Sequence, residues 1–544
     1  MKRRAIEGAY LLALLEKDRD KDSSFEETVS MIIQVTDVKK EGFMLAYQSY
    51  LDFLSKKIEW YELKSSLRNV LAYFINLSEN EINAFSNEYF KQIKSEYSKI
   101  KFRNENYLLE GKKFARIYNF ELNEYNQVKL HISIITNNMI EYDKIMFDKN
   151  KKDNYYKPYF VEFISDYIDL DYLKISNFDV DCENDYWIEI DFLDDSGRKS
   201  NYKYIDGTFI FSASPLKIGK RTIKLIGINV PEEVKNFNKL YLEKVKNYVI
   251  DTKEKSLKKE LEAIFPKSYK ECKITIFNVG QGSLNLIEMD NKKILFDIGD
   301  SKYKGEAIER NNKEKADKLI KSINPYCVIL SHWDLDHILG IAKMTDEIFD
   351  AYWIVPDITK KNGFSDSAKR LICFLAWYSK TKLFSICSKS NDMNNKIIFS
   401  NNIFELGKGS GKTYSSKTSS YLCHKINSLN FQNNFGLVLK VKGIEEDAIF
   451  AGDCEYKAFP KNFMTHYPKY LVVPHHGSKM DFNIGIKVSK AKLAFISAGK
   501  NDYKCKGSTD CDSHPHICHI NFLENNGYSV YQTSLTSYYT FKLS

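Results

Sequence analysis

Residues 327 to 340, CVILSHWDLDHILG, decide how this sequence is read. The first four residues are apolar and predict a buried strand. The loop after such a strand is where active sites of α/β proteins usually lie. It would carry His332, Asp334, Asp336 and His337. Alternating side chains in a tight loop converge on one point, so this spacing suits a pair of metal ions that share ligands. The alternative interpretation is a polar turn with coincidental histidines.

Three later segments offer further ligands for the same site. AIFAGDCEY (448–456) and LVVPHHGSKM (471–480) again read as apolar strands that end in Asp453, and in His475 and His476. DSHPHICH (512–519) adds His514 and His516. Only one histidine precedes residue 332, so histidine chemistry is expected in the C-terminal half.

The chain is long enough for more than one domain. It has 544 residues, whereas single hydrophobic cores stop growing at about 250 to 300 residues. With 43% hydrophobic and 14% aromatic residues it can bury real cores. The net charge of +8 permits an anionic partner such as nucleic acid without requiring one.

The pattern of residues divides the chain into three regions. Residues 1–115 read mainly as helices, and the Ser78–Glu81 pair is a capping box that predicts a helix start. Residues 116–270 read as strands at about 128–135, 184–193, 201–213 and 221–230, followed by a charged helical connector. Residues 271–544 begin with paired strands and continue with strand–helix–strand order. The expected fold class is therefore α/β, with an α+β module in front of the C-terminal domain.

No segment of the sequence predicts contact with a membrane. The N-terminal apolar run, 9–15, is short and leads into a charged segment instead of a cleavage site. No run approaches the ~20 apolar residues of a membrane helix. Ten cysteines in so long a chain do not make a disulfide framework. We therefore expect a cytoplasmic protein.

The C-terminal region resembles a known family. NVGQG, FDIGD, SHWDLDH, NNFGLVLKV, FAGD, VPHHGS, SAGKND and SHPH occur between residues 278 and 516 in the order typical of the metallo-β-lactamase superfamily. The region is most similar to the soluble hydrolase domain of ComEC-type DNA-uptake channels. The resemblance covers about 273–544 and implies an αββα sandwich with its metal site at one edge of the two sheets. Residues 1–272 resemble no family.

The resemblance also implies roles for the candidate residues. His332 and Asp334 would bind one metal, Asp336 and His337 the other, and Asp453 would bridge them. His514 most resembles the terminal histidine ligand. One of His475 and His476 would be a ligand and the other a proton donor. Asp297 would orient a ligand without binding metal. The sequence departs from the family at Asn434, where many relatives have a histidine, and at Ser283, where uptake-channel relatives have an aspartate.

The carboxylate at Asp334, where many metal hydrolases have a histidine, favours one class of substrate. Replacing an imidazole by a carboxylate makes a site harder and more negative, which shifts its preference toward Mn²⁺ or Mg²⁺ alongside Zn²⁺. Cations neutralise nonbridging oxygens and activate water, as phosphodiester chemistry requires. We therefore expect two divalent ions, zinc or manganese, and a nuclease or other phosphodiesterase. Asp336 would take part in catalysis, and His476 or His516 would protonate the leaving oxygen.

Two alternatives stay open for function. The chain could hydrolyse a small cyclic or signalling nucleotide in a pocket covered by residues 357–430. It could instead bind a partner and use its metal structurally or for regulation. A role in bacterial antiphage defence is suggested by analogy alone.

The N-terminal half offers candidate contacts for partners. KNKKDNYYKPYF (149–160) and PLKIGKRTIK (215–224) combine lysines with aromatic residues and could follow a nucleic-acid backbone. The same half could bind a protein partner. Near the C-terminus, Cys505, Cys511 and Cys518 could form a small zinc site, although their spacing matches no standard pattern.

Overall fold

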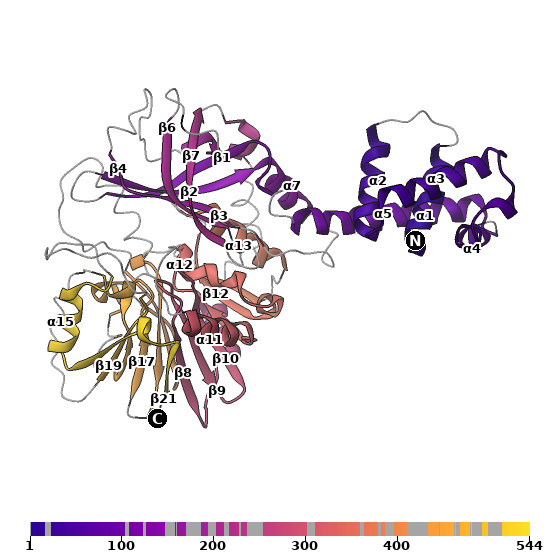
Figure 1. The fold of residues 1–544 in the computed structure, drawn as a ribbon. Coiled ribbons are helices and arrows are strands. Elements are labelled where there is room, and N and C mark those ends of the chain that lie inside the picture. Colours follow the sequence, from indigo (N-terminus) through magenta and orange to yellow (C-terminus); the bar gives the residue numbers. More distant parts are fainter. Residues whose placement is uncertain are drawn as a thin grey trace. The chain divides into compact units, whose positions relative to one another are not determined.

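The structure is a computed structural model, and it divides the chain into two compact units (Figure 1). Unit 1 comprises 1–111 and 141–156, and unit 2 comprises 112–140 and 157–544. The structure describes residues 2–16, 23–74, 76–103, 108–122, 127–146, 158, 160–169, 186–193, 198, 203–211, 217–227, 230–236, 254–301, 310–358, 364–378, 382–386, 396–410, 433–444, 446–461, 463, 468–478, 480, 492–498 and 514–543.

Unit 1 is helical, as the sequence predicts. The described helices are α1 (Arg3–Glu16), α2 (Ser23–Thr36), α3 (Lys40–Leu54), the short η1 (Trp60–Glu62), α4 (Ser65–Phe74) and α5 (Glu79–Arg103). The predicted capping box is confirmed at the start of α5, because the Ser78 N–H donates to Glu81 Oε2 (2.8 Å) and the Glu81 N–H donates to Ser78 Oγ (3.4 Å). The core is aromatic, with the rings of Tyr50 and Phe74 centred 5.2 and 4.9 Å from that of Tyr10.

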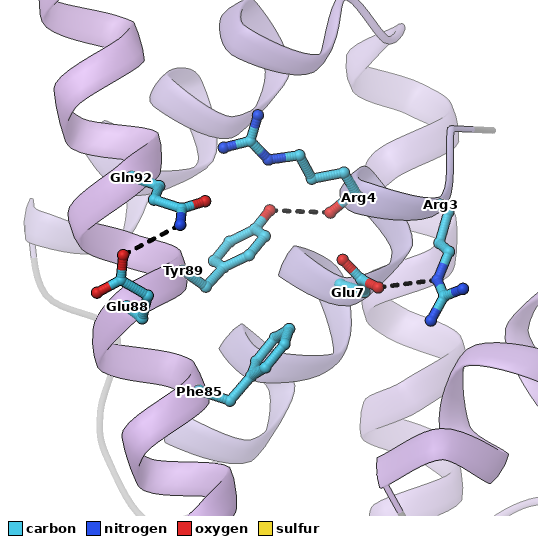
Figure 2. A pocket seen from close by; sticks show the side chains of 7 residues that line it. All are labelled: Arg3, Arg4, Glu7, Phe85, Glu88, Tyr89 and Gln92. Carbon is cyan, nitrogen blue, oxygen red and sulfur yellow. Dashed lines mark hydrogen bonds and ion pairs between the residues drawn. The ribbon is translucent and has the colours of Figure 1, made fainter. Parts of the chain in front are cut away.

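A hollow of about 370 Å³ lies between α1 and α5 (Figure 2). Some of its polar groups contact each other or the backbone within the unit. The Tyr89 hydroxyl donates to the Arg4 carbonyl (2.9 Å), and Arg3 pairs with Glu7 (3.0 Å). The hollow is lined by Arg3, Arg4, Glu7, Phe85, Glu88, Tyr89 and Gln92.

Unit 2 begins with a closed ring of antiparallel strands. Its strands are β1 (Lys113–Leu122), β2 (Gln127–Thr136), β3 (Val161–Ser165), β4 (Ile168–Asp169), β5 (Tyr186–Phe192), β6 (Lys203–Phe211) and β7 (Lys217–Gly227). The order is β1-β5-β7-β6-β3-β2-β4, and an additional pairing of β1 with β2 closes six of the strands into a ring. The predicted strands at 128–135, 184–193, 201–213 and 221–230 correspond to β2, β5, β6 and β7. The prediction missed β1, β3 and the short β4. The short helix α7 (Asn137–Met146) follows β2, and the boundary between the two units falls within it.

Two more sheets follow helix α10 (Glu254–Ile264) in the chain. The first has the order β13-β12-β11-β10-β9-β8-β21. Its strands are β8 (Cys272–Phe277), β9 (Leu284–Met289), β10 (Lys292–Ile298), β11 (Cys327–Ile329), β12 (Tyr352–Pro356), β13 (Leu383–Ile386) and β21 (Tyr538–Leu543). The second runs in sequence order, β14 (Lys396–Ser400), β15 (Phe404–Lys408), β16 (Leu437–Lys442), β17 (Asp447–Phe450), β18 (Tyr470–Val472), β19 (Lys492–Ile496) and β20 (Tyr528–Gln532).

These two sheets share one apolar core. Side chains of β8, β9 and β10 are buried in the same cluster as side chains of β15, β16 and β17, and the rings of Phe296 and Phe450 are centred 5.6 Å apart. The other face of the second sheet packs against helix α15 (Ile517–Asn525), where Leu523 is buried with Ile449 and Ala494. The first sheet is accompanied by α11 (Arg310–Lys321), α12 (Leu335–Ile338) and α13 (Asp366–Tyr378). The chain is therefore a mixed α/β protein.

A buried polar cluster joins the ring of strands to α13. Arg116 on β1 is fully buried, pairs with Asp366 (2.9 Å) and donates to the carbonyl of Phe364. Glu162 on β3 accepts hydrogen bonds from the hydroxyls of Ser133 and Ser367. Burial raises the pKa of Glu162 to about 8, so this carboxyl keeps its proton at neutral pH. The polar contacts fix the ring on the start of α13.

Among the described residues, no helix is both long and apolar enough to cross a membrane.

Candidate metal centre

The site forms where strand ends from both sheets meet. β11 leads into the loop from Ser331 to α12, β17 leads into Gly452 and Asp453, and β18 leads into the turn Pro474–Gly477. The N–H of Leu437, at the start of β16, donates to the Ser331 carbonyl (2.8 Å) and so ties the loop to the other sheet. Gly452 has φ of 54°, and a Cβ there would lie 2.4 Å from the Ser331 Cβ. Glycine therefore allows the two strand ends to approach closely.

Asp453 lies between two pairs of histidines. Its Oδ2 is 3.6 Å from His332 Nε2 and 3.7 Å from His475 Nε2. Its Oδ1 is 3.1 Å from His337 Nε2 and 3.7 Å from His476 Nε2. Each oxygen of one buried carboxylate thus faces a different pair of imidazoles, which is the geometry of a carboxylate that bridges two cations.

The two remaining aspartates of the motif lie on opposite sides of this arrangement. Asp334 Oδ2 is 3.5 Å from His332 Nε2, and Asp336 Oδ2 is 3.6 Å from His476 Nε2. Two groups of ligand atoms could therefore hold a metal ion, His332 with His337 and Asp453, and Asp336 with His337 and His476.

The histidines are anchored so that their Nε2 atoms face the centre. Nδ1 of His337 lies 2.8 Å from Asp297 Oδ2, Nδ1 of His476 lies 2.8 Å from the Ser497 carbonyl, and Nδ1 of His332 lies 3.0 Å from Ser331 Oγ. The three Nε2 atoms are buried and make no hydrogen bond to any described residue. Metal-binding histidines commonly use one ring nitrogen in this way and present the other to the ion. The side chains present could therefore hold a metal ion.

Asp297 and Ser331 connect residues of the motif through hydrogen bonds. Asp297 accepts hydrogen bonds from the Ser331 N–H (2.7 Å) and hydroxyl (2.9 Å) in addition to its contact with His337. It has φ of 63°, an uncommon conformation for a residue other than glycine. The expected orienting role of Asp297 matches this geometry. Ser331 was missed in the sequence, although its position directly before His332 was visible there.

Burial and charge act against each other at the centre. Burial disfavours the imidazolium of His337, but the carboxylates of Asp453 and Asp297 outweigh it and raise the pKa of His337 well above its usual range. Burial likewise disfavours the Asp453 carboxylate, yet the neighbouring histidines hold its pKa well below its usual range. The Asp453 carboxylate is therefore stabilised as an anion by positive charge, which bound cations would also supply.

The turn that carries His475 and His476 has an unusual backbone. Both residues have positive φ (48° and 52°), and Gly477 follows with φ of 77°. Non-glycine residues in this region cost about 1–3 kcal/mol each and cluster at functional sites. The turn is held by the His475 N–H, which donates to the Gly452 carbonyl (3.0 Å). Strain here places two neighbouring imidazoles on the two sides of Asp453.

Other predicted residues lie around this centre without joining the two groups of described ligand atoms. The ring of His514 is centred 5.6 Å from that of His475. His516 is buried at the start of α15, and its Nδ1 accepts from the Cys518 N–H (3.1 Å). Asn434 is buried, and its Oδ1 accepts from the Glu455 N–H (2.9 Å). The structure thus places both His475 and His476 beside Asp453. The sequence had left open which of the two is a ligand.

The NVGQG loop supports the motif through its backbone. The Ser283 N–H donates to the Asp336 carbonyl (3.0 Å), and the Gly299 N–H donates to the Ser283 carbonyl (2.6 Å). A Cβ on Gly299 would lie 1.9 Å from the Asp336 carbonyl oxygen. Ser283, where uptake-channel proteins have an aspartate, therefore supports Asp336 through a backbone hydrogen bond.

The basic stretches are only partly described. Residues 149–157 lie outside the described part of the chain. On β7, Lys220 pairs with Asp166 (2.5 Å), and the Arg221 guanidinium lies 4.8 Å from the ring centres of both Phe192 and Phe209. Cys505 and Cys511 of the conceivable zinc site also lie outside the described residues, and Cys518 is a free, half-buried cysteine.

Comparisons with known proteins add one likeness. No protein-family model and no curated protein matches the chain. Among solved structures, the chain is similar to the metallo-β-lactamase fold protein YhfI from Bacillus subtilis. The identity is 11%, the TM-score is 0.26, and the match covers 50% of this chain and all of the other. The side chains of the site therefore carry the functional argument.

Proposed function

We propose that this protein is a metal-dependent hydrolase of the metallo-β-lactamase type, with an αββα arrangement of its two C-terminal sheets. Within that class, we propose a phosphodiesterase that cleaves nucleic acid. The observation that carries the proposal is Asp453, whose two oxygens face separate pairs of histidines with one further aspartate on each side.

In this proposal each cation has its own set of ligands, and His337, which belongs to both groups of ligand atoms described above, is given to the second cation. His332, Asp334 and His475 would hold one ion, Asp336, His337 and His476 the other, with Asp453 shared. When bound, a pair of divalent cations neutralises charge on the phosphate and lowers the pKa of the attacking water. The carboxylate of Asp334 makes its side of the centre harder than a second imidazole would, which favours oxygen-rich substrates and ions such as Mn²⁺.

His516 is better suited than His476 to donate a hydrogen bond to the leaving oxygen. The Nδ1 of His476 donates to the Ser497 carbonyl, so a neutral His476 has a lone pair on Nε2 that would bind a cation. The Nδ1 of His516 accepts from the Cys518 N–H, so a neutral His516 carries its proton on Nε2. The His516 N–H also donates to the Gly477 carbonyl (2.8 Å), which places its backbone beside the histidine turn.

The test uses the purified chain loaded with Mn²⁺ or Zn²⁺. Its hydrolysis of single-stranded DNA, double-stranded DNA, RNA and bis(p-nitrophenyl) phosphate is measured. Asp453→Asn should lower activity at least about 100-fold and reduce bound metal, because a bridging ligand is removed. Asp447→Asn, at the other end of the same strand, is the matched control and should retain both. Loss of neither activity nor metal in Asp453→Asn would overturn the assignment.

Nucleic acid is distinguished from a small nucleotide by charge. A polyanion that crosses the centre releases counterions, so its binding should depend steeply on salt. Changing Lys217, Lys220 and Arg221 to Ala should weaken binding of a long substrate and flatten its salt slope. Hydrolysis of bis(p-nitrophenyl) phosphate should stay nearly unchanged. Equal effects on both substrates would instead favour the small-nucleotide hydrolase. A partner-binding protein with a structural metal would hydrolyse neither.

A further inference from the structure

The turn that carries His475 and His476 is supported at its end by the segment that leads into helix α15. Both histidines have positive φ, and such strained conformations persist only where the surrounding structure fixes them. The carbonyl of the next residue, Gly477, accepts a hydrogen bond from the His516 N–H (2.8 Å). A Cβ on Gly477 would lie 2.9 Å from the Cβ of Pro515, so this segment packs directly on the turn.

A second contact comes from the side chain of His519 on α15, which is fully buried. Its Nδ1 lies 2.9 Å from the carbonyl oxygen of Ser478, the residue that follows the turn. Because a carbonyl only accepts hydrogen bonds, Nδ1 is the donor. Burial lowers the pKa of His519 to about 4, so the imidazole is uncharged at neutral pH and its Nε2 carries a lone pair.

That lone pair is used by Tyr456, a residue of the segment that carries Asp453. The Tyr456 hydroxyl lies 3.0 Å from His519 Nε2 and donates to it, and the two rings meet edge-on with centres 5.6 Å apart. Tyr456 begins the short helix η7 (Tyr456–Ala458), shortly after Asp453, and its side chain is buried. One ring nitrogen of His519 is therefore fixed to the Asp453 segment and the other to the residue after the histidine turn.

These contacts connect two of the segments that meet at the metal centre. One supplies Asp453, and the other supplies His475 and His476, whose Nε2 atoms are each 3.7 Å from an Asp453 oxygen. The Ser478 N–H donates to the His475 carbonyl (2.8 Å), so the residue held by His519 also takes part in the hydrogen bonding of the turn. Residues that orient the ligands of a metal site commonly affect its metal affinity about 10- to 100-fold.

We propose that His519 is a positioning residue of the metal centre. Held by the Tyr456 hydroxyl, it fixes the Ser478 carbonyl and so keeps the imidazoles of the histidine turn at Asp453. The inference rests on the proposed metal-dependent function, since it concerns how the chain presents its ligands to cations. It assigns a role to a histidine that lies outside both groups of ligand atoms described above.

The experiment measures two quantities for variants of the full chain, the Zn²⁺ affinity by competition with a chromophoric chelator and the Tm of the metal-free protein. His519→Leu loses both contacts and should bind Zn²⁺ about 10- to 100-fold more weakly than the wild-type protein. His519→Asn can still donate to the Ser478 carbonyl and should recover part of this affinity. Tyr456→Phe removes only the hydroxyl and should weaken binding by less than His519→Leu.

Tyr528→Phe is the matched control. Tyr528 is buried in the same apolar cluster as Tyr456. Its hydroxyl donates to the carbonyl of Pro468 (2.9 Å), which precedes β18 at the end opposite the histidine turn. Removing this hydroxyl should lower Tm about as much as Tyr456→Phe does, because each variant loses one buried hydrogen bond. It should leave Zn²⁺ affinity unchanged, which separates the placement of ligands from general stability.

The results distinguish this inference from the function on which it rests. Weaker Zn²⁺ binding by His519→Leu and Tyr456→Phe, partly recovered in His519→Asn and absent in Tyr528→Phe, supports the positioning role. The role is overturned, and the proposed function stands, if the wild-type protein binds Zn²⁺ and these variants bind it equally well. The same holds if His519→Asn binds no better than His519→Leu, or if Tyr528→Phe weakens binding as much as Tyr456→Phe.

Two further outcomes are also decisive. A folded wild-type protein that binds neither Zn²⁺ nor Mn²⁺ would overturn the proposed function and the role of His519 together. If His519→Leu does not fold, the comparison of Tyr456→Phe with Tyr528→Phe decides, because each of these variants removes a single hydroxyl from the same apolar cluster.

Discussion

Glu162→Gln should stabilise unit 2 at high pH and have little effect at low pH. The carboxyl is fully buried between Ser133 and Ser367, and burial raises its pKa from 4.5 to about 8. In the unfolded chain the group ionises near its ordinary pKa, so between pH 4.5 and 8 the folded state holds a proton that the unfolded state has released. Stability therefore falls as pH rises through this window and levels off above it.

The size of this effect follows from the displacement of the pKa. A pKa difference of one between the folded and unfolded states corresponds to about 1.4 kcal/mol. Keeping the proton on Glu162 therefore lowers the free energy of unfolding by about 3 kcal/mol at pH 7 and by up to about 5 kcal/mol at pH 8 and above. Glutamine has the same shape and cannot ionise, so it avoids this cost while it still accepts from the two serine hydroxyls. The neighbouring titratable groups, Asp366, Arg116 and Tyr118, are the same in both proteins.

The assay is thermal unfolding in buffers from pH 5 to pH 8.5, with hydrogen exchange of β3 and α13 as a local readout. The Tm difference between Glu162→Gln and the wild-type protein should be small at pH 5 and widen by several degrees by pH 8. Glu260→Gln, on the exposed face of α10, is the matched control and should leave the profile unchanged. A Tm difference that is constant across this range would refute the reasoning.

Three further predictions concern the metal centre. The double change Asp336→Ala with His337→Ala should remove at least one of two bound ions per chain, measured by elemental mass spectrometry; unaltered metal content would contradict the ligand assignment. Asp334→His should move the best activating ion from Mn²⁺ toward Zn²⁺ in a hydrolysis assay across metals, and an unchanged profile would show that the carboxylate does not set the preference. Gly452→Ala should lower Tm by an amount equivalent to at least about 1–3 kcal/mol, because residue 452 has φ of 54° and the new Cβ would lie 2.4 Å from the Ser331 Cβ. An unchanged Tm would mean that the close approach of the two strand ends does not require glycine.

The candidate site was largely predictable from the sequence because its ligands follow short apolar strands. The end of a strand is predicted by the apolar residues before Ser331, Gly452 and Pro474. Strand ends of neighbouring sheets meet at one edge. The division between His475 and His476 could not be predicted, because it depends on two successive positive φ angles that place adjacent imidazoles on opposite sides of Asp453.

The ring of strands was predicted less well, for a different physical reason. The sequence did not predict β1, β3 or the short β4, although it did predict a strand at residues 128–135. The closure of the ring depends on the pairing of β1 with both β2 and β5, and the buried pair of Arg116 with Asp366 joins residues 250 positions apart. Local periodicity contains no information about such distant partners.

Strand β21 has a consequence for how the chain is made. It pairs with β8 from Leu543 opposite Cys272 to Tyr538 opposite Phe277, and the ring of Phe541 stacks 4.0 Å from that of Tyr470 in the other sheet. The edge of β8 is thus covered by a strand that is synthesised long after it. Until then β8 presents an unpaired apolar edge, which is a template for association with other nascent chains. This edge of β8 is therefore unpaired throughout the interval between the synthesis of β8 and that of β21.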